Sequence, residues 1–156
     1  MKNLTADGRT RLPDVESTRL VVRKTIRASR ERLFGAWTEP DQLVRWWGPT
    51  GVVCIAAEVD LRIGGQYRIG NRMPNNEVVW IEGEFKLIDC PNELRYSWRI
   101  GPAMEPVERV RVRFVAQGSV TEVVVEHDKI PAAKLRDQHQ YGWVGCLDGL
   151  AEFLVG

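Results

Sequence analysis

The spacing of hydrophobic positions along this chain changes from helical to alternating and back to helical. Residues 52–127 alternate between apolar and polar side chains, a period of two that is typical of half-buried strands. Turns rich in Gly, Pro and Asn divide this region, so we expect its strands to pair in sequence as an antiparallel sheet. A further strand is predicted at residues 20–26. The strands predicted in the alternating region are residues 52–61, 66–71, 78–88, 94–100, 107–116 and 120–127.

Two short helices are predicted between the first strand and the alternating region. Ser29 can cap the first of them, which runs to about residue 37. The second covers about residues 40–47, with Thr38 as its expected cap and Pro40 in its first turn. Helices this short are not stable alone in water. We therefore expect their tryptophans to fix them to a larger structure.

A long helix is predicted from Pro131 nearly to Gly156. Its apolar stripe has to be buried against the sheet. Gly142, Gly145 and Gly149 weaken its intrinsic propensity and are expected to let it approach a neighbouring surface closely. The elements together indicate an α+β fold, in which a curved sheet wraps around the last helix and the short helices close the space between them. The stripe contains Leu135, His139, Trp143, Cys146, Leu147, Leu150 and Phe153.

The alternation also assigns the two faces of the sheet. Arg109, Arg111 and Arg113 share one face, and Glu122 and Glu126 follow the same phase in the next strand, which suits a solvated outer face. The other face is predicted to point inward, where it either fills a core or lines a cavity. Its predicted members include Tyr67, Ile69, Val79, Ile81, Phe85, Leu94, Tyr96, Trp98, Ile100, Val110, Val112, Phe114, Val123, Val125 and His127.

Length and composition favour one domain over residues 18–156, preceded by a flexible arm over residues 1–17. The chain has 22 Lys and Arg against 21 Asp and Glu, a formal net charge of +1. This balance gives no reason to expect a nucleic acid or an anionic membrane as a partner. No stretch approaches the ~18 continuous apolar residues of a membrane span. The three cysteines lack a metal or disulfide spacing, which favours a reduced, cytoplasmic protein.

The sequence carries few signs of catalysis. It has only two histidines and no metal-binding, phosphate-binding or nucleophile-elbow motif, so no metal or cofactor is implied. His127 and His139 both lie on predicted inner faces and are weak catalytic candidates, as general acid–base groups beside Tyr67 or Tyr96. A structural role is the commoner one for each histidine taken alone. Cys146 is expected to act as a small hydrophobic residue.

Several segments together resemble one known family. They are Ala36-Trp37-Thr38-Glu39-Pro40, Trp46-Trp47-Gly48-Pro49, Asp60-Leu61-Arg62-Ile63-Gly64-Gly65, Glu93-Leu94 with Trp98, and His139, Gly142-Trp143, Leu147-Asp148 and Leu150 in the last helix. This set is similar to the bacterial homologues of the activator of the ninety-kilodalton heat-shock-protein ATPase. That family is part of the helix-grip superfamily of START domains, polyketide cyclases and the birch pollen allergen. Ile63 departs from the Arg-Pro-Gly-Gly pattern that the family often has.

The resemblance implies a β-α-α-β6-α helix-grip fold with an internal cavity, but fold alone does not fix function. Our first hypothesis is a monomer or homodimer that binds a small hydrophobic or aromatic molecule in that cavity. The alternatives are a cyclase- or dehydratase-like enzyme that uses a cavity histidine and tyrosine, and a chaperone co-regulator that acts through its surface. Catalysis is less favoured than binding. The predicted ligand-binding residues are Trp47, Tyr67, Phe85, Tyr96, Trp98, Phe114, His139, Trp143 and Leu147.

Overall fold

The structure, a computed structural model, describes residues 19–102 and 106–155. The predicted arm at residues 1–17 lies outside the described residues. The described residues form a strand, two short helices, six strands and a long helix, which confirms the α+β helix-grip prediction. The elements are β1 (Leu20–Ile26), α1 (Arg30–Thr38), α2 (Pro40–Trp46), β2 (Val53–Val59), β3 (Gln66–Arg72), β4 (Val78–Asp89), β5 (Glu93–Gly101), β6 (Glu108–Gln117), β7 (Val120–Asp128) and α3 (Ala133–Val155).

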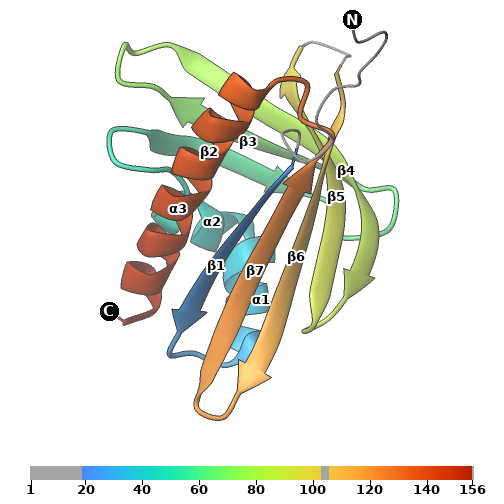
Figure 1. The fold of residues 1–156 in the computed structure, drawn as a ribbon, viewed down its shortest axis with the longest axis vertical. Helices are drawn as coiled ribbons and strands as arrows, with labels where there is room; N and C mark the ends of the chain where they lie inside the picture. The colour runs from blue at the N-terminus through green and yellow to red at the C-terminus, as the bar shows by residue number, and fades with distance from the viewer. Residues whose placement is uncertain (1–18, 103–105, 156) are drawn as a thin grey trace, which may run out of the picture.

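All seven strands belong to one antiparallel sheet with the order β1-β7-β6-β5-β4-β3-β2. The first strand therefore pairs with the last one, and every other pair joins strands that follow each other in sequence. The sheet is curled, and α3 runs along its open side (Figure 1). Even α3, with 23 residues, has no stretch apolar enough to cross a membrane, and neither has any other described helix.

The two short helices begin and end where their capping groups are satisfied, with one difference from the prediction. Ser29 caps α1 as expected, since its hydroxyl accepts a hydrogen bond from the Arg32 amide at 3.1 Å. Thr38 does not cap α2. It is the last residue of α1, and its hydroxyl donates to the Phe34 carbonyl at 2.8 Å. Glu39 takes the cap position of α2, and its side chain makes no capping hydrogen bond.

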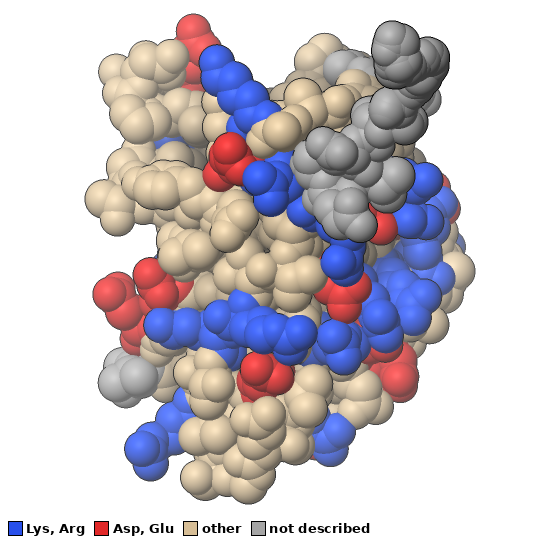
Figure 2. Space-filling model, viewed as in Figure 1, with Lys and Arg blue, Asp and Glu red and all other residues tan. Residues whose placement is uncertain are grey.

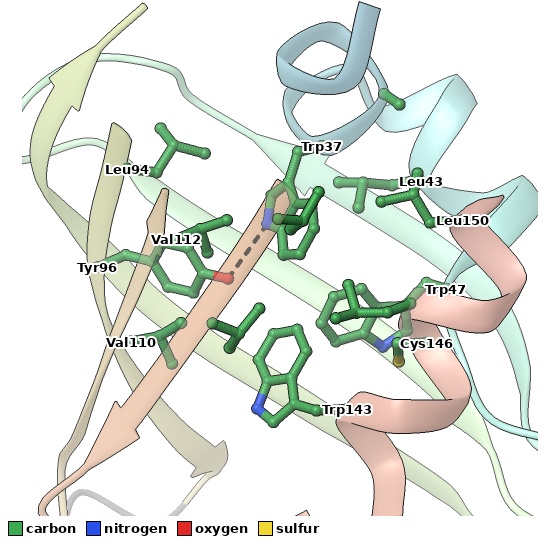
Figure 3. Packing of buried hydrophobic residues seen from close by; sticks show 14 of the residues in the cluster. Trp37, Leu43, Trp47, Leu94, Tyr96, Val110, Val112, Trp143, Cys146 and Leu150 are labelled. Atoms are coloured by element: carbon green, nitrogen blue, oxygen red, sulfur yellow. Dashed lines mark hydrogen bonds between the residues drawn. The ribbon is translucent and has the colours of Figure 1, made fainter. Parts of the chain in front are cut away.

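Tryptophans connect the short helices to the sheet and to α3, as Figure 3 shows for Trp37 and Trp143. The Trp37 indole donates to the Tyr96 hydroxyl on β5 at 3.2 Å and stacks on Trp143 of α3, with 6.0 Å between ring centroids. Trp46 joins the two short helices, because its indole donates to the Ala36 carbonyl at 2.8 Å. Neither helix has to be stable by itself, because each is tied to the core through these rings.

The outer face of the sheet is charged and solvated, as its alternation predicted. Arg109 pairs with Asp128 at 2.9 Å, and Arg113 pairs with Glu126 at 3.0 Å. Figure 2 shows basic and acidic side chains interspersed over this side of the molecule, where Figure 1 places β1, β7 and β6. Charges of both signs interspersed in this way are typical of a surface that faces water.

The last helix approaches α2 closely at two of its three glycines. A Cβ atom on Gly145 would lie 2.4 Å from Cβ of Pro49, and one on Gly149 would lie 2.7 Å from the Trp46 carbonyl oxygen. Both distances are too short for a side chain, so the prediction of a close approach is confirmed there. It is wrong for Gly142, where a Cβ would meet nothing within 4 Å. Open space lies beside α3 at that point.

Candidate functional site

The open space beside Gly142 belongs to a cavity of about 540 Å³ between α3 and the sheet. Its walls come from α3, the turn after α2, the β3–β4 turn, and strands β3, β4 and β5. This volume falls within the range of small-molecule sites. The cavity is lined by Trp47, Pro49, Thr50, Val52, Asn71, Met73, Pro74, Val79, Ile81, Trp98, Ile100, Leu135, Gln138, His139, Tyr141, Gly142, Trp143 and Cys146.

The cavity has an aromatic floor and a more polar mouth. Trp47, Trp98 and Trp143 are buried, and their ring centroids lie 5.3 to 6.3 Å apart. Thr50 and Tyr141 at the mouth are exposed. Trp46 ties the two short helices together, whereas its neighbour Trp47 lines the cavity.

A cluster of three titratable side chains, Glu108, His127 and His139, lies at one end of this cavity. Oε1 of Glu108 is 2.7 Å from Nε2 of His127 and 3.0 Å from Nε2 of His139. The two imidazoles stack with their centroids 4.7 Å apart. Trp98 lies against both, with its ring centroid 4.9 Å from that of His127 and 5.8 Å from that of His139. Of the three, only His139 lines the cavity.

Strand register and helix periodicity bring the cluster together. Val110 pairs directly with His127, so Glu108, two residues earlier on the same face of β6, is the diagonal neighbour of His127. His139 and Trp143 are one helical turn apart on α3 and face the sheet side by side. His139 meets Glu108, and the Trp143 indole donates to Nδ1 of His127 at 3.0 Å.

The contact with Trp143 fixes the tautomer of His127. An indole nitrogen only donates, so Nδ1 of His127 has to be the acceptor and the proton of the neutral ring sits on Nε2. From there it donates to Glu108. This assignment follows from the hydrogen-bond network. His127 has no exposed surface, and its burial lowers its pKa against the opposing effect of Glu108, which agrees with a neutral ring.

Glu108 is ionised in this arrangement. Burial alone would raise the pKa of its carboxyl, but the hydrogen bonds from His127 and His139 outweigh burial and hold that pKa below its usual range. The nearby thiol and phenols are neutral instead. Burial raises the pKa of the Cys146 thiol to about 12, and burial also raises the pKa values of Tyr67 and Tyr96 well above their ordinary range. Cys146 therefore offers no thiolate, and the two tyrosines offer no phenolate.

The predicted ligand-binding residues fall into three places. Trp47, Trp98, His139 and Trp143 line the 540 Å³ cavity. Tyr67, Phe85 and Tyr96 line a separate void of about 20 Å³ deeper between α1, α2 and the sheet. Phe114 and Leu147 are buried in the core and line neither space. The tyrosines suggested as partners of the histidines therefore do not face the same space as His139.

Sequence reasoning missed Glu108 and Asn71 at the site, and it did not foresee that the indole N–H of Trp98 is unpaired within the described residues. Glu108 shares the inward phase of Val110 and Val112, so strict alternation would have placed it inside. Its charge and the neighbouring arginines favoured the outer face instead. Two wall side chains also hold buried polar atoms that have no hydrogen-bond partner among the described residues: Oδ1 of Asn71 and Nε1 of Trp98. Such atoms are rare and mark places where a partner belongs.

These features define a helix-grip protein with an apolar cavity and a buried carboxylate–histidine cluster. The family model described as Activator of Hsp90 ATPase homolog 1-like protein matches residues 27–155, and the chain belongs to this family. No curated protein is similar enough to count as a match.

Solved structures share the fold at low sequence identity. A Chromobacterium violaceum protein is 23% identical with a TM-score of 0.79, covering 86% of this chain and 95% of its own. An AHSA1 protein from Silicibacter pomeroyi is 19% identical with a TM-score of 0.78, covering 88% and 97%. An AHSA1-like protein from Aeromonas hydrophila is 22% identical with a TM-score of 0.73, covering 87% and 91%.

Proposed function

We propose that this protein binds a small, largely apolar molecule in the cavity between α3 and the sheet. The observation that carries the proposal is the cavity of about 540 Å³, whose base is formed by Trp47, Trp98 and Trp143. Large rings of this kind offer apolar area and stacking surfaces to an aromatic ligand. The half-buried His139 adds a polar contact beside the three tryptophans, and a mostly apolar site with a few polar groups is typical of small-molecule binding.

Gly142 allows a direct test, because it lies in the cavity wall with open space beyond it. Gly142→Leu should fill part of the cavity and block binding. Gly142→Ala is the matched control, since it adds only one methyl group and should leave binding nearly unchanged. Binding of a panel of aromatic molecules would be followed by native mass spectrometry and by the change in tryptophan fluorescence. Equal binding by Gly142→Leu and the parent would contradict the proposal.

A second candidate is an enzyme of the cyclase or dehydratase kind. The contact between Glu108 and His139 favours it, because a carboxylate that accepts from one imidazole nitrogen orients the ring for acid–base work. Chemical change of a bound molecule over time, detected by mass spectrometry and lost in His139→Phe, would identify catalysis. Release of every bound molecule unchanged would leave binding as the function.

A further inference from the structure

The cluster of Glu108, His127 and His139 has the outline of a metal site. Each residue offers a ligand atom, and these atoms lie within 4.8 Å of one another. Two histidines and a carboxylate form a common set of ligands for transition metals. The hydrogen bonds around the cluster decide whether those atoms are free to bind a metal.

Trp143 opposes metal binding through His127. A metal on Nε2 of His127 would require that nitrogen to lose its proton, and the neutral ring would then carry its proton on Nδ1. Nδ1 is the atom that accepts the Trp143 indole N–H at 3.0 Å, and two N–H groups would then face each other. Metal-binding histidines normally direct the other ring N–H to an acceptor, which Trp143 cannot be. The cluster therefore holds protons in place of a metal.

The same network determines what His139 presents to the cavity. The ionised Glu108 only accepts hydrogen bonds, so Nε2 of His139 has to donate to it, as Nε2 of His127 does. In the neutral ring this leaves the lone pair on Nδ1. No described residue makes a hydrogen bond to that atom, and His139 is the cluster member that lines the cavity. A carboxylate on the opposite nitrogen makes the imidazole a stronger acceptor.

We propose that the cavity selects an apolar molecule with one weakly acidic hydroxyl, of which a phenol is the simplest kind, and that the hydroxyl donates to Nδ1 of His139. The inference rests on the proposed binding function and adds the polar group of the ligand. If the proton is transferred, Nδ1 gains it and the ligand becomes an oxyanion. The imidazolium then lies between that anion and Glu108, and no bond other than O–H is broken.

The test compares two probes with the same rings, 2-naphthol and 2-methoxynaphthalene, by isothermal titration calorimetry. Only the first has a proton to donate. We expect the parent protein to bind 2-naphthol about tenfold more tightly, the scale of one hydrogen bond. Glu108→Gln removes the charged acceptor that fixes the His139 tautomer, so it should reduce this preference to about twofold or less. Glu126→Gln, on the outer face of β7, is the matched control and should keep the full preference.

His139→Phe provides a second variant, because it keeps a ring against Trp98 and does not bury an unpaired charge. It should bind both probes with similar affinity. Equal binding of the probes by the parent protein would overturn this inference and leave the proposed cavity function standing. Absence of binding by both probes would count against the proposed function itself. A titration with zinc chloride completes the test, since stoichiometric binding that His127→Gln abolishes would identify a metal site and overturn the inference.

Discussion

Trp143 contributes both apolar volume and a hydrogen-bond donor to the interior. It is 3% exposed, stacks on Trp37, and donates to Nδ1 of His127. Trp143→Ala should lower the free energy of unfolding by about 3–5 kcal/mol, as for other buried tryptophans. Trp143→Phe keeps much of the ring but leaves Nδ1 of His127 without its donor, at a cost of about 1–3 kcal/mol. Urea denaturation of both variants measures the two contributions. A melting temperature for Trp143→Ala within a few degrees of the parent would contradict the burial.

His127 should make the protein less stable in weak acid. Burial lowers its pKa in the folded state below the ordinary value of 6.5, so the unfolded chain takes up this proton first as the pH falls. Its contribution to stability is complete above about pH 6.5 and is lost as the pH falls toward the folded pKa, with a slope of at most about 1.4 kcal/mol per pH unit. The lowered pKa of Glu108 acts in the same direction below about pH 4.5.

The measurement is best made in His139→Phe, because His127 is then the only histidine in the chain and burial, the largest cause of its lowered pKa, is retained. Urea denaturation at pH 7, 6 and 5 should show a free energy of unfolding that decreases with the pH. A free energy of unfolding that instead increases as the pH falls from 7 to 5 would mean that His127 is charged in the folded protein. It would also mean that the tautomer assigned from Trp143 is wrong.

Single positions show where sequence reasoning reaches its limit. The phase of β6 was predicted correctly for Val110 and Val112, and the same phase places Glu108 inside. Its charge made the outer face the natural choice, because an unpaired carboxylate is costly to bury. The partners that remove this cost come from β7 and α3, and their register against β6 cannot be derived from one sequence.

At the scale of elements, most boundaries follow from local pattern. Alternation and turn residues predicted every strand to within two residues, because one buried face requires a period of two. The cap of α2 was predicted wrongly because α1 continues through Thr38 and uses its hydroxyl internally. Which glycines of α3 touch another element depends on how the helix docks, and the sequence does not contain that information directly.

Two glycines of α3 should respond to alanine in opposite ways. Gly142→Ala has open space and better helix propensity, so it should raise the free energy of unfolding by about 0.5–1 kcal/mol. Gly145→Ala would place Cβ 2.4 Å from Pro49 and should destabilise the protein by about 1–3 kcal/mol through overpacking. Thermal denaturation of the two variants side by side tests the docking of α3. An equal stabilisation of both would mean that α3 does not approach the turn after α2.

At the scale of the whole molecule, one chain of aromatic contacts connects the elements. Trp37, Trp46, Trp47, Trp98 and Trp143 touch in succession and connect α1, α2, β5 and α3. The sixth tryptophan, Trp80, is apart from them and lies under the Arg68 guanidinium, 4.0 Å from the ring centroid. Tryptophan fluorescence therefore reports mainly on the joint between the sheet and the helices.

We expect unfolding in urea to be a single cooperative transition. Tryptophan fluorescence reports on the contacts between the helices and the sheet, and far-ultraviolet circular dichroism reports on the helices and strands themselves. The two transitions should coincide if these contacts and the secondary structure belong to one cooperative unit. A fluorescence transition at lower urea would indicate that the helices separate from the sheet before the secondary structure is lost. In that case the core would be two units.

The contacts of Gly145 and Gly149 divide α3 into two halves that differ in freedom of movement. The second half is held against the backbone around Trp46 and Pro49, whereas the first turns, near Leu135 and Gln138, have the cavity beside them. Amide hydrogen exchange should therefore be faster in these first turns than in the second half of the helix. A molecule that fills the cavity would contact the first turns and should slow their exchange more than exchange near Gly149.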